Sequence, residues 1–309
     1  MSNLFKVIYL VLVFAIVGIL YIGIYQSEPP AEQFSKNAGQ EESKEFKSIA
    51  AQRKEIEEKT REAEKRVENA KIDPEFETMV LVSAGKFTMG SDKGSAMEQP
   101  AREVYLDAFY IDKYEATFTQ FYSFIAATQY PRKPRLAGYL AVDPKGIPVL
   151  LNPYSPVVGV SWDDSISYCA WKDKRLPTEA EWEKAAKGMD QREWPWGNEE
   201  NPKFANLVGE IDGFEYSSPV GSIREDRSPF GAYDMAGNAM EWVSSWFRED
   251  YYRLMPELNP KGPAEGDMRG IRGASWHDSI LRAKTTIRFK TSPTYRDVTI
   301  GFRCAKSKN

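Results

Sequence analysis

The sequence predicts an α+β fold, because strand patterns and helix patterns both occur between residues 73 and 309. Two β-rich runs on either side of a Ser-Ala-Gly turn are typical of a hairpin. Apolar residues at helical spacing indicate amphipathic helices, and Thr178 with Glu181 forms a capping box in front of one of them. From residue 190 to 273 the sequence shows little periodicity. The expected strands cover residues 79–82, 86–89 and 105–112, and the expected helices cover residues 117–128, 163–171 and 178–187.

Composition and charge narrow the possible functions. The chain has 309 residues, 42% of them hydrophobic, which is enough for one sizeable domain and an appendage. Its net charge is −4 and the folded part has no basic cluster, which argues against a nucleic-acid partner. His277 is the only histidine, so a metal site built on several histidines is excluded. A Ser-His-Asp triad would have to use this same residue.

Residues 7–25 predict a transmembrane helix, so that residues 1–25 form a membrane anchor. The run carries no charge, and as a helix it would be about 28 Å long, close to the ~30 Å hydrocarbon core of a bilayer. A cleaved signal peptide, the alternative, usually has a shorter apolar run followed by small residues. Lys6 precedes the run and Glu28 and Glu32 follow it. We therefore expect a single-pass protein of a bacterial-type inner membrane, with a cytoplasmic N-terminus and a periplasmic domain.

Residues 26–72 are predicted to connect this anchor to a folded domain at residues 73–309. Residues 26–40 are mostly polar and include two consecutive prolines, which indicates a linker. Residues 41–71 contain nine acidic and nine basic residues, several of them in favourable pairs four apart, which predicts a charged helical stalk. Apolar residues in the stalk keep heptad spacing, but Arg53 and Thr60 interrupt it. A partner helix and a solvated single helix are both compatible with this pattern.

Residues 228–247 combine glycines, polar residues and tryptophans in a way that predicts a folded loop. Gly231 and Gly237 permit positive φ or a close backbone approach. Asn238 and Glu241 offer side-chain oxygens three residues apart and, with neighbouring carbonyls, can surround a hard cation such as Ca²⁺. The alternative is a tight turn whose Asn and Glu bind its own backbone.

Within this loop, GAYDMAGNAMEWVSSWF resembles the GLYDMxGNVWEWxSDWW signature of the formylglycine-generating enzyme family, the sulfatase-modifying-factor domain. Five further segments agree with the family in order, so the resemblance covers roughly residues 76–306. It implies a C-type-lectin-like α+β fold with little regular secondary structure. The further segments are MVLVSAGKFTMGS (79–91), EQPAREVYLDAFYIDKYEAT (98–117), PVVGVSWDDSISYCAWKDKRLPTEAEWEKAAKG (156–188), WPWGNE (194–199) and GFRCA (301–305).

The two cysteines, Cys169 and Cys304, have two possible states. A disulfide is allowed if the domain lies outside the cytoplasm, whereas two buried free thiols are the alternative. In the family the cysteine of an AYCxW motif pairs with that of GFRCA. Because SYCAW and GFRCA both occur here, the resemblance implies a disulfide between Cys169 and Cys304, which leaves no cysteine for catalysis.

The resemblance also implies two structural calcium sites, one in ANLVGEIDGFE (205–215) and one in the glycine-containing loop. Each site would combine side-chain oxygens with backbone carbonyls, which are ligands that Ca²⁺ prefers. For the first site the implied ligands are the side chains of Asn206 and Asp212 and the carbonyls of Leu207 and Phe214. For the second site they are the side chains of Asn238 and Glu241 and the carbonyls of Gly237 and Ala239.

The catalytic segment of the family is altered in this chain. Active members bind copper through two cysteines in a GGSxxCxxxxC segment, and the matching segment here is GASWHDSILRA (273–283). Ser275 is kept, but Asp278 and Ala283 occupy the cysteine positions and cannot supply the thiolates that Cu(I) prefers. Copper is therefore not expected. His277, Asp278 and Ser275 are the catalytic candidates that remain, and a surface pair of His277 with Asp278 is the alternative.

We therefore expect a membrane-anchored, calcium-stabilised and non-catalytic domain that binds a protein partner in an envelope or membrane complex. The alternative is an oxidoreductase or maturation enzyme that modifies an exported protein without the cysteine pair. A carboxylate and His277 that converge in one pocket with an open metal position would favour the enzyme. A broad apolar patch at the position of the cysteine pair would favour the binding module.

The predicted membrane anchor is expected to remain in the mature protein, because no cleavage pattern follows residues 7–25. Carbonate extraction should leave the protein in the membrane fraction, and intact-mass analysis should find the N-terminus present. A soluble product that begins near Ser27 would contradict this prediction.

Overall fold

The computed structural model describes residues 31–136 and 146–308, with side chains from residue 47 onward. The chain divides between Glu57 and Glu58 into two units, and each is described by itself. The predicted transmembrane helix lies outside the described residues. In the part of the chain that the structure describes, no helix is both long enough and apolar enough to cross a membrane.

The long helix α2 covers Ala31–Asn69 and belongs partly to each unit. It begins ten residues earlier than the predicted stalk, so the prediction that residues 31–40 form a linker is wrong. The physical reason is that these ten residues are mostly good helix formers, and one glycine among them costs only about 1 kcal/mol.

The apolar stripe of α2 is used differently in the two units. In the second unit, Ala63 and Val67 are buried in the core of the folded domain. In the first unit, Ile49 remains 45% exposed. The last turns of the helix therefore pack on the chain's own domain, and a partner helix for the earlier turns stays a prediction.

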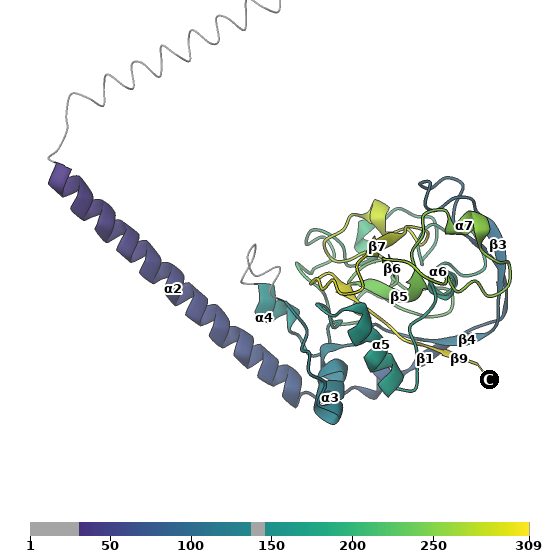
Figure 1. The fold of residues 1–309 in the computed structure, drawn as a ribbon, viewed down its shortest axis with the longest axis horizontal. Coiled ribbons are helices and arrows are strands. Elements are labelled where there is room, and N and C mark those ends of the chain that lie inside the picture. Colours follow the sequence, from purple (N-terminus) through teal and green to yellow (C-terminus); the bar gives the residue numbers. More distant parts are fainter. Residues whose placement is uncertain (1–30, 137–145, 309) are drawn as a thin grey trace, which may run out of the picture. The chain divides into compact units, whose positions relative to one another are not determined.

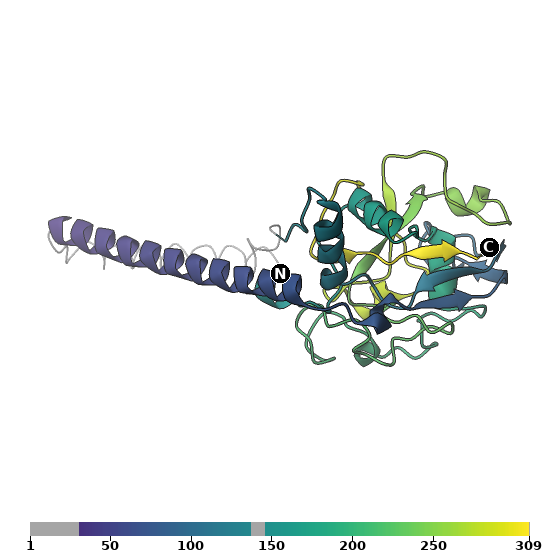
Figure 2. The same cartoon turned by 90° about the horizontal axis from the view of Figure 1, so that it is seen from below.

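Three small sheets form the framework of the second unit (Figure 1). One has the strand order β1-β4-β9, a second consists of β2 and β3, and the third has the order β7-β6-β5-β8. Figure 2 shows β9, in yellow, beside the blue strands β1 and β4. The strands are β1 (Met79–Val82), β2 (Gly85–Met89), β3 (Arg102–Leu106), β4 (Phe109–Asp112), β5 (Met240–Trp246), β6 (Arg269–Arg272), β7 (Phe289–Thr291), β8 (Ile300–Gly301) and β9 (Ala305–Ser307).

The first two strands do not form the predicted hairpin. β1 pairs with β4, and β2 pairs with β3, so the two strands belong to different sheets. Gly85 has a φ of +140°, a conformation that L side chains rarely adopt and that lets the chain pass from one sheet to the other. The expected strand at 105–112 is also two strands, β3 and β4. The positions of these first strands were thus predictable from local pattern, whereas their partners were not, and β5 to β9 were not predicted.

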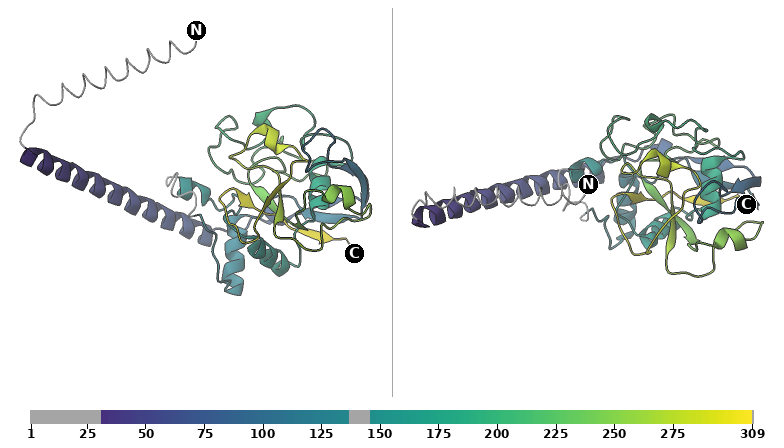
Figure 3. Two further views of the ribbon diagram at one scale, coloured as in Figure 1. Left: turned by 45° about the horizontal axis from the view of Figure 1, so that its top comes forward. Right: turned by 90° about the horizontal axis from the view of Figure 1, so that it is seen from above.

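The three predicted helices are present as α3 (Phe118–Thr128), α5 (Trp162–Trp171) and α6 (Glu179–Lys187). Each begins with a capping box, in which the cap side chain and the third helical residue satisfy each other's backbone N–H. Helices α3 and α5 lie side by side in both views of Figure 3. The shorter helices are η1 (Pro74–Glu77), α4 (Ile147–Leu150), η4 (Pro202–Phe204), α7 (Tyr251–Leu254) and η5 (Ile280–Ala283).

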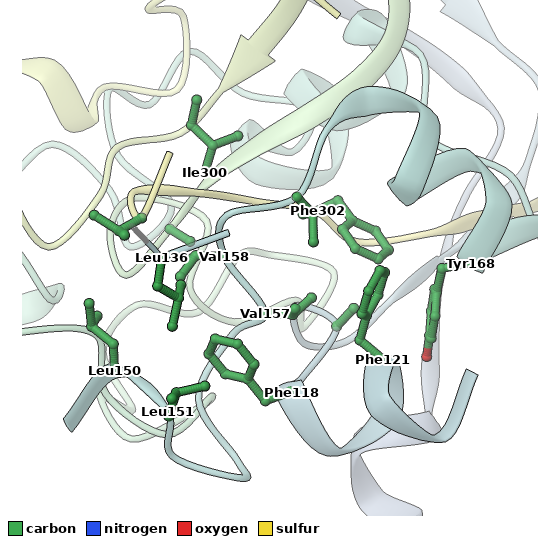
Figure 4. Close-up of a cluster of buried hydrophobic side chains, with 14 of the residues drawn as sticks. Phe118, Phe121, Leu136, Leu150, Leu151, Val157, Val158, Tyr168, Ile300 and Phe302 are labelled. Atoms are coloured by element: carbon green, nitrogen blue, oxygen red, sulfur yellow. The ribbon is translucent and has the colours of Figure 1, made fainter. Parts of the chain in front are cut away.

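The largest apolar cluster contains the disulfide between Cys169 and Cys304, which confirms the pairing that the resemblance implies. Aromatic rings of Phe121, Tyr168 and Phe302 pack together in this cluster, with centroids 5.3 to 6.3 Å apart (Figure 4). The bond therefore joins α5 to the segment before β9 inside a dry core.

The glycine-containing segment 228–247 is only partly a loop. Its second half is β5, an inner strand of the four-stranded sheet. Trp242 is fully buried on this strand, whereas Trp246 is half-buried. The β-rich run MEWVSSW explains the strand, because alternate aromatic and β-branched side chains pack well on a pleated surface.

Candidate functional site

The segment that replaces the family's cysteine pair is a tight turn after β6. Gly273 has a φ of +75°, and a Cβ atom there would meet the Trp182 ring at 3.2 Å. Ser275 donates to Asp278 Oδ2 from its backbone nitrogen at 3.0 Å and from its hydroxyl at 2.6 Å. Arg282 Nε donates to Asp278 Oδ1 at 2.6 Å. The carboxylate of Asp278 thus holds the turn and is not available as a free base.

His277, Ser275 and Asp278 lie close in sequence but do not form a proton relay. The hydroxyl of Ser275 donates to Asp278. The hydrogen bond between His277 and Ser275 uses the backbone nitrogen of His277 as the donor and the Ser275 hydroxyl oxygen as the acceptor, so it does not involve the imidazole. The His277 side chain is exposed, with its ring 5.3 Å from that of Trp276. A nucleophilic serine needs a base that accepts its proton, and here the imidazole does not accept it.

Ala283, at the other cysteine position, is fully buried. It belongs to a small apolar cluster that also contains Trp194, Leu207 and Ala274. A methyl group in this environment contributes packing and no metal ligand. Within residues 31–136 and 146–308, no group of three or more His, Cys, Asp or Glu side chains is arranged to hold a metal ion.

Three exposed apolar side chains lie on the altered segment and on the loop that bonds to it, and we refer to Val208, Ile211 and Leu281 together as the apolar surface. Their side chains are 51%, 52% and 55% exposed. The backbone nitrogen of Val208 donates to the Asp278 carbonyl at 2.9 Å, which joins the loop of Val208 to the altered catalytic segment. Leu281 lies on η5, two residues before the buried Ala283. Three large apolar side chains therefore face solvent on the two segments that this bond joins.

The first predicted calcium set has one free acceptor. Asn206 is buried, and its Nδ2 donates to the Tyr216 carbonyl at 3.0 Å and to Asn238 Oδ1 at 3.3 Å. Its Oδ1 has no hydrogen-bond partner among the described residues. Asp212 accepts the backbone N–H groups of Leu207 at 3.0 Å and Phe214 at 2.9 Å. A buried oxygen without a partner, next to a half-buried carboxylate, fits a cation ligand set.

The second predicted calcium set does not fit. Glu241 is fully buried, and its carboxylate accepts from the Arg303 guanidinium at 2.7 to 2.9 Å and from Trp182 Nε1 at 2.8 Å. Asn238 Oδ1 already accepts the Ser218 N–H at 2.9 Å. Because Arg303 offsets the charge of Glu241, this carboxylate acts as the partner of an arginine and not of an ion.

Arg303 is the residue whose importance the sequence did not indicate. It is fully buried and, besides Glu241, its guanidinium donates to four backbone carbonyls. The GFRCA motif pointed to this position only as part of a signature, because its partner Glu241 lies 62 residues away. The carbonyl acceptors belong to Asp112, Lys113, Tyr233 and Asp234.

A second buried ion-pair network lies behind the altered segment. Arg272 Nη2 donates to Glu183 at 2.7 Å, and Arg288 Nε donates to Glu179 at 2.7 Å. Burial alone would raise the pKa of Glu179, but Arg288 and Arg272 together lower it below its ordinary value. Lys187 Nζ also lies 3.5 Å from Glu183, so three cations face two carboxylates and neither carboxylate is left free for acid–base work.

Three further buried carboxylates are compensated only in part, by the charge of Arg303. Burial raises the pKa of Glu115 and of Asp226 well above ordinary values, and neighbouring carboxylates raise both further. Burial also raises the pKa of Asp234 to about 7. The Asp226 Oδ1 has no hydrogen-bond partner among the described residues, and Asp234 accepts the Gly221 N–H at 2.6 Å. These acids therefore bind protons more readily in the folded protein than in the unfolded chain.

The comparisons with known proteins agree with the family resemblance of the sequence. A model of the sulfatase-modifying factor enzyme 1-like domain matches residues 64–308. Formylglycine-generating enzyme of Bos taurus is 34% identical, over 74% of this chain and 74% of that protein. Inactive C-alpha-formylglycine-generating enzyme 2 of Mus musculus is 32% identical, over 74% of this chain and 85% of that protein. Serine/threonine-protein kinase pkn1 of Chlamydia caviae is 34% identical over 80% of this chain, but the chain spans only 41% of its length.

A solved structure shows the same fold. The structure of PvdO from Pseudomonas aeruginosa matches with a TM-score of 0.63 and 28% identity, over 74% of this chain and 94% of that chain. Together with the mixed helices and sheets, this similarity supports the predicted α+β fold.

Replacement of Asp234 by Asn should make stability less dependent on pH. Since the folded pKa lies above the ordinary value of 3.8, the contribution of Asp234 is fully present below about pH 4 and is lost as the pH rises through about 7. Asn keeps an acceptor for the Gly221 N–H and carries no charge. In urea unfolding at pH 5 and pH 8, Asp234→Asn should narrow the difference in unfolding free energy and be the more stable protein at pH 8.

The control for this experiment is Asp267→Asn, at an exposed position. It should reproduce the pH dependence of the unchanged protein. If Asp234→Asn did the same, the charge of Asp234 would not contribute to this dependence.

Proposed function

Because the chain belongs to the family of sulfatase-modifying factor enzyme 1-like domains, we propose that it is a non-catalytic member that binds another protein. Asp278 and Ala283 replace the two cysteines, and both have structural roles. Asp278 is bound to Ser275 and Arg282, and Ala283 is buried in an apolar cluster. The alternative of an enzyme needs His277 and a carboxylate in one pocket, but His277 is exposed and Asp278 is occupied.

The observation that carries the proposal is the apolar surface of Val208, Ile211 and Leu281. Each side chain is about half exposed, so a partner can remove a large part of its apolar area from water. Such burial contributes roughly 25 cal/mol per Å². Isolated exposed apolar residues are common, but several on adjoining segments at a former active site mark an interaction surface. The mouse relative described by name as inactive is consistent with a family member that has given up the reaction.

We place this binding domain outside the cytoplasm, on a membrane anchor at residues 7–25, as a subunit of an envelope or membrane complex. The disulfide between Cys169 and Cys304 supports this placement, because such bonds persist in oxidising compartments. The apolar surface is then available to an envelope protein or to the exposed part of another membrane protein.

The binding surface can be tested by site-specific photocrosslinking of the full-length protein in its own membranes. A photoreactive phenylalanine analogue at Leu281 should give one discrete adduct, and Ile211→Asp in the same chain should remove it. The matched control places the analogue at Leu254, which is 62% exposed on α7. No adduct from position 281, or the same adducts from both positions, would contradict a partner at this surface.

The altered segment should not convert cysteine to formylglycine. Without the two thiolates, the chain lacks the ligands that hold Cu(I) in active members. The purified protein, incubated with copper, oxygen, a reducing thiol and a CxPxR peptide, should yield no more aldehyde by mass than a reaction without protein. The Bos taurus relative, run in parallel, serves as the positive control. Aldehyde above the blank would show that the proposal of a non-catalytic member is wrong.

We further propose that the first ligand set holds a structural Ca²⁺. Asn206 Oδ1 is a buried acceptor without a partner, and Asp212 supplies the negative charge. An ion at this point would tie Asn206, which bonds to Asn238, to the loop that carries Val208 and Ile211. The ion would thus order one edge of the apolar surface.

Calcium should raise the melting temperature through Asp212 and not through Glu241. An ion that binds only the folded state at a hundredfold excess over Kd adds about 2.7 kcal/mol, so chelation should lower the melting temperature by several degrees. Asp212→Ala should abolish this difference between millimolar calcium and excess EDTA. Glu241→Ala should lower stability by roughly 3–5 kcal/mol, because it leaves Arg303 buried without its carboxylate, while the calcium response is retained.

Differential scanning fluorimetry and elemental analysis measure the two effects. Overlaid melting curves with calcium and with EDTA, and no bound ion, would show that hydrogen bonds alone hold this loop.

A further inference from the structure

One cavity lies away from the altered segment, and we name it the β9 groove. It measures about 610 Å³, within the range of about 300–1,000 Å³ that is usual for small-ligand sites. β9, α5, the start of α6, the turn between β3 and β4 and the loop at residues 259–261 form its walls. None of the residues at 205–241 or 273–283 lines it. A ligand in this groove would therefore not contact the apolar surface of Val208, Ile211 and Leu281.

The floor of the β9 groove is apolar. Leu106, Phe109 and Leu176 line it, and each is no more than 2% exposed. Ile166 and Ala170 of α5 line it as well, and Ala170 is exposed. Since the first three side chains are almost fully buried, an apolar chain or ring would displace water mainly from Ile166 and Ala170, which is favourable in proportion to the area covered.

The basic side chains nearest the protein interior are already neutralised. Lys174 Nζ lies 2.6 Å from Asp112, and Arg175 binds both carboxylate oxygens of Glu181 at 2.6 and 2.7 Å. These pairs are mostly buried and fix the wall of the groove. They contribute little net charge to a ligand.

The exposed charges at the rim are not balanced. Lys261 and Lys308 line the groove, are exposed, and form no ion pair within the part of the chain that the structure describes. Asp107 is the one exposed acid among the lining residues, and the side-chain amide of Asn259 donates to it at 2.8 Å. Two unpaired positive charges thus face one negative charge, of which one oxygen, Asp107 Oδ2, accepts from Asn259.

We propose that the β9 groove binds an amphiphilic anion, with an apolar chain or ring on the floor and one carboxylate, sulfonate or phosphate group near Lys261 and Lys308. Charge complementarity selects an anion, because the ammonium groups at the rim have no other partners. The apolar floor selects an amphiphile over a bare inorganic anion, which would leave the floor in contact with water. Neither feature depends on calcium or on the altered cysteine segment.

Equilibrium dialysis of labelled octanoate against the full-length chain in nanodiscs of uncharged lipid tests the proposal, with uptake by empty nanodiscs subtracted. Octanoate should bind saturably at one site per chain, and octan-1-ol at least tenfold more weakly. Lys261→Gln with Lys308→Gln should weaken octanoate at least tenfold, whereas Asp107→Asn should strengthen it. Ala170→Trp, which fills the groove without a change of charge, should abolish binding.

The matched control removes two exposed lysines elsewhere, Lys93→Gln with Lys203→Gln, and should leave the affinity within twofold. An unchanged melting temperature of each variant shows that it is folded. The proposal is overturned by the absence of saturable uptake, by equal affinity for octanoate and octan-1-ol, or by equal loss in the test and control variants. Loss of photocrosslinking at Leu281 would leave octanoate binding intact, so the two proposals fail separately.

Discussion

The fold depends on one buried ion pair, between Glu241 of β5 and Arg303 just before β9. Both side chains are fully buried, so neither charge can return to water without opening the core. Removal of two ions from water costs several kcal/mol for each ion, and this cost is offset only when every donor and acceptor has a partner. Here the partners are complete: the guanidinium reaches four carbonyls besides Glu241, and Trp182 donates to the carboxylate. Because the four carbonyls lie near residues 112 and 233, the pair joins the first sheet, the irregular loops and the C-terminal strand at one point.

This constraint explains how the scaffold persists without the cysteine pair. The altered segment lies between β6 and η5, and Gly273 packs on the same Trp182 ring that donates to Glu241. Behind it, Arg272 and Arg288 are held by Glu183 and Glu179. None of these contacts involves the two positions at which the family has cysteines. Asp278 and Ala283 could therefore replace a thiolate pair while the surrounding core stayed in place.

The sequence predicted the local elements and the family but not the long-range partners. Helices α3, α5 and α6 follow from periodicity and capping residues, and the disulfide follows from two motif cysteines. The pairing of β1 with β4 and the partner of Glu241 could not be read from the sequence, since each depends on a residue brought close only by the fold.

The same limit applies to the calcium sets. Asn238 and Glu241 have the right oxygens at a suitable spacing, but an arginine 62 residues along the chain takes the carboxylate first. The apolar surface was a conditional expectation, because exposure of Val208 and Leu281 depends on what covers them.

The irregular loops before β5 raise the question of what holds backbone groups that no sheet ladder can satisfy. Buried side chains form hydrogen bonds to most of these backbone groups. Glu115 accepts the Ala239 N–H, Asp226 accepts that of Ala236, and Asp234 accepts that of Gly221, while Asn238 accepts that of Ser218. Each carboxylate thus accepts a backbone N–H group of a loop, as the carbonyls of a neighbouring strand do for β5. This arrangement removes a charged group from water, which costs free energy. That cost appears as the raised pKa of Glu115, Asp226 and Asp234.

Where such acids satisfy the backbone, a cation is unnecessary. At Asn206, a buried amide oxygen lacks a partner among the described residues, and the neighbouring Leu207 N–H is bound by the half-exposed Asp212, which is why the structural argument for calcium concerns that loop.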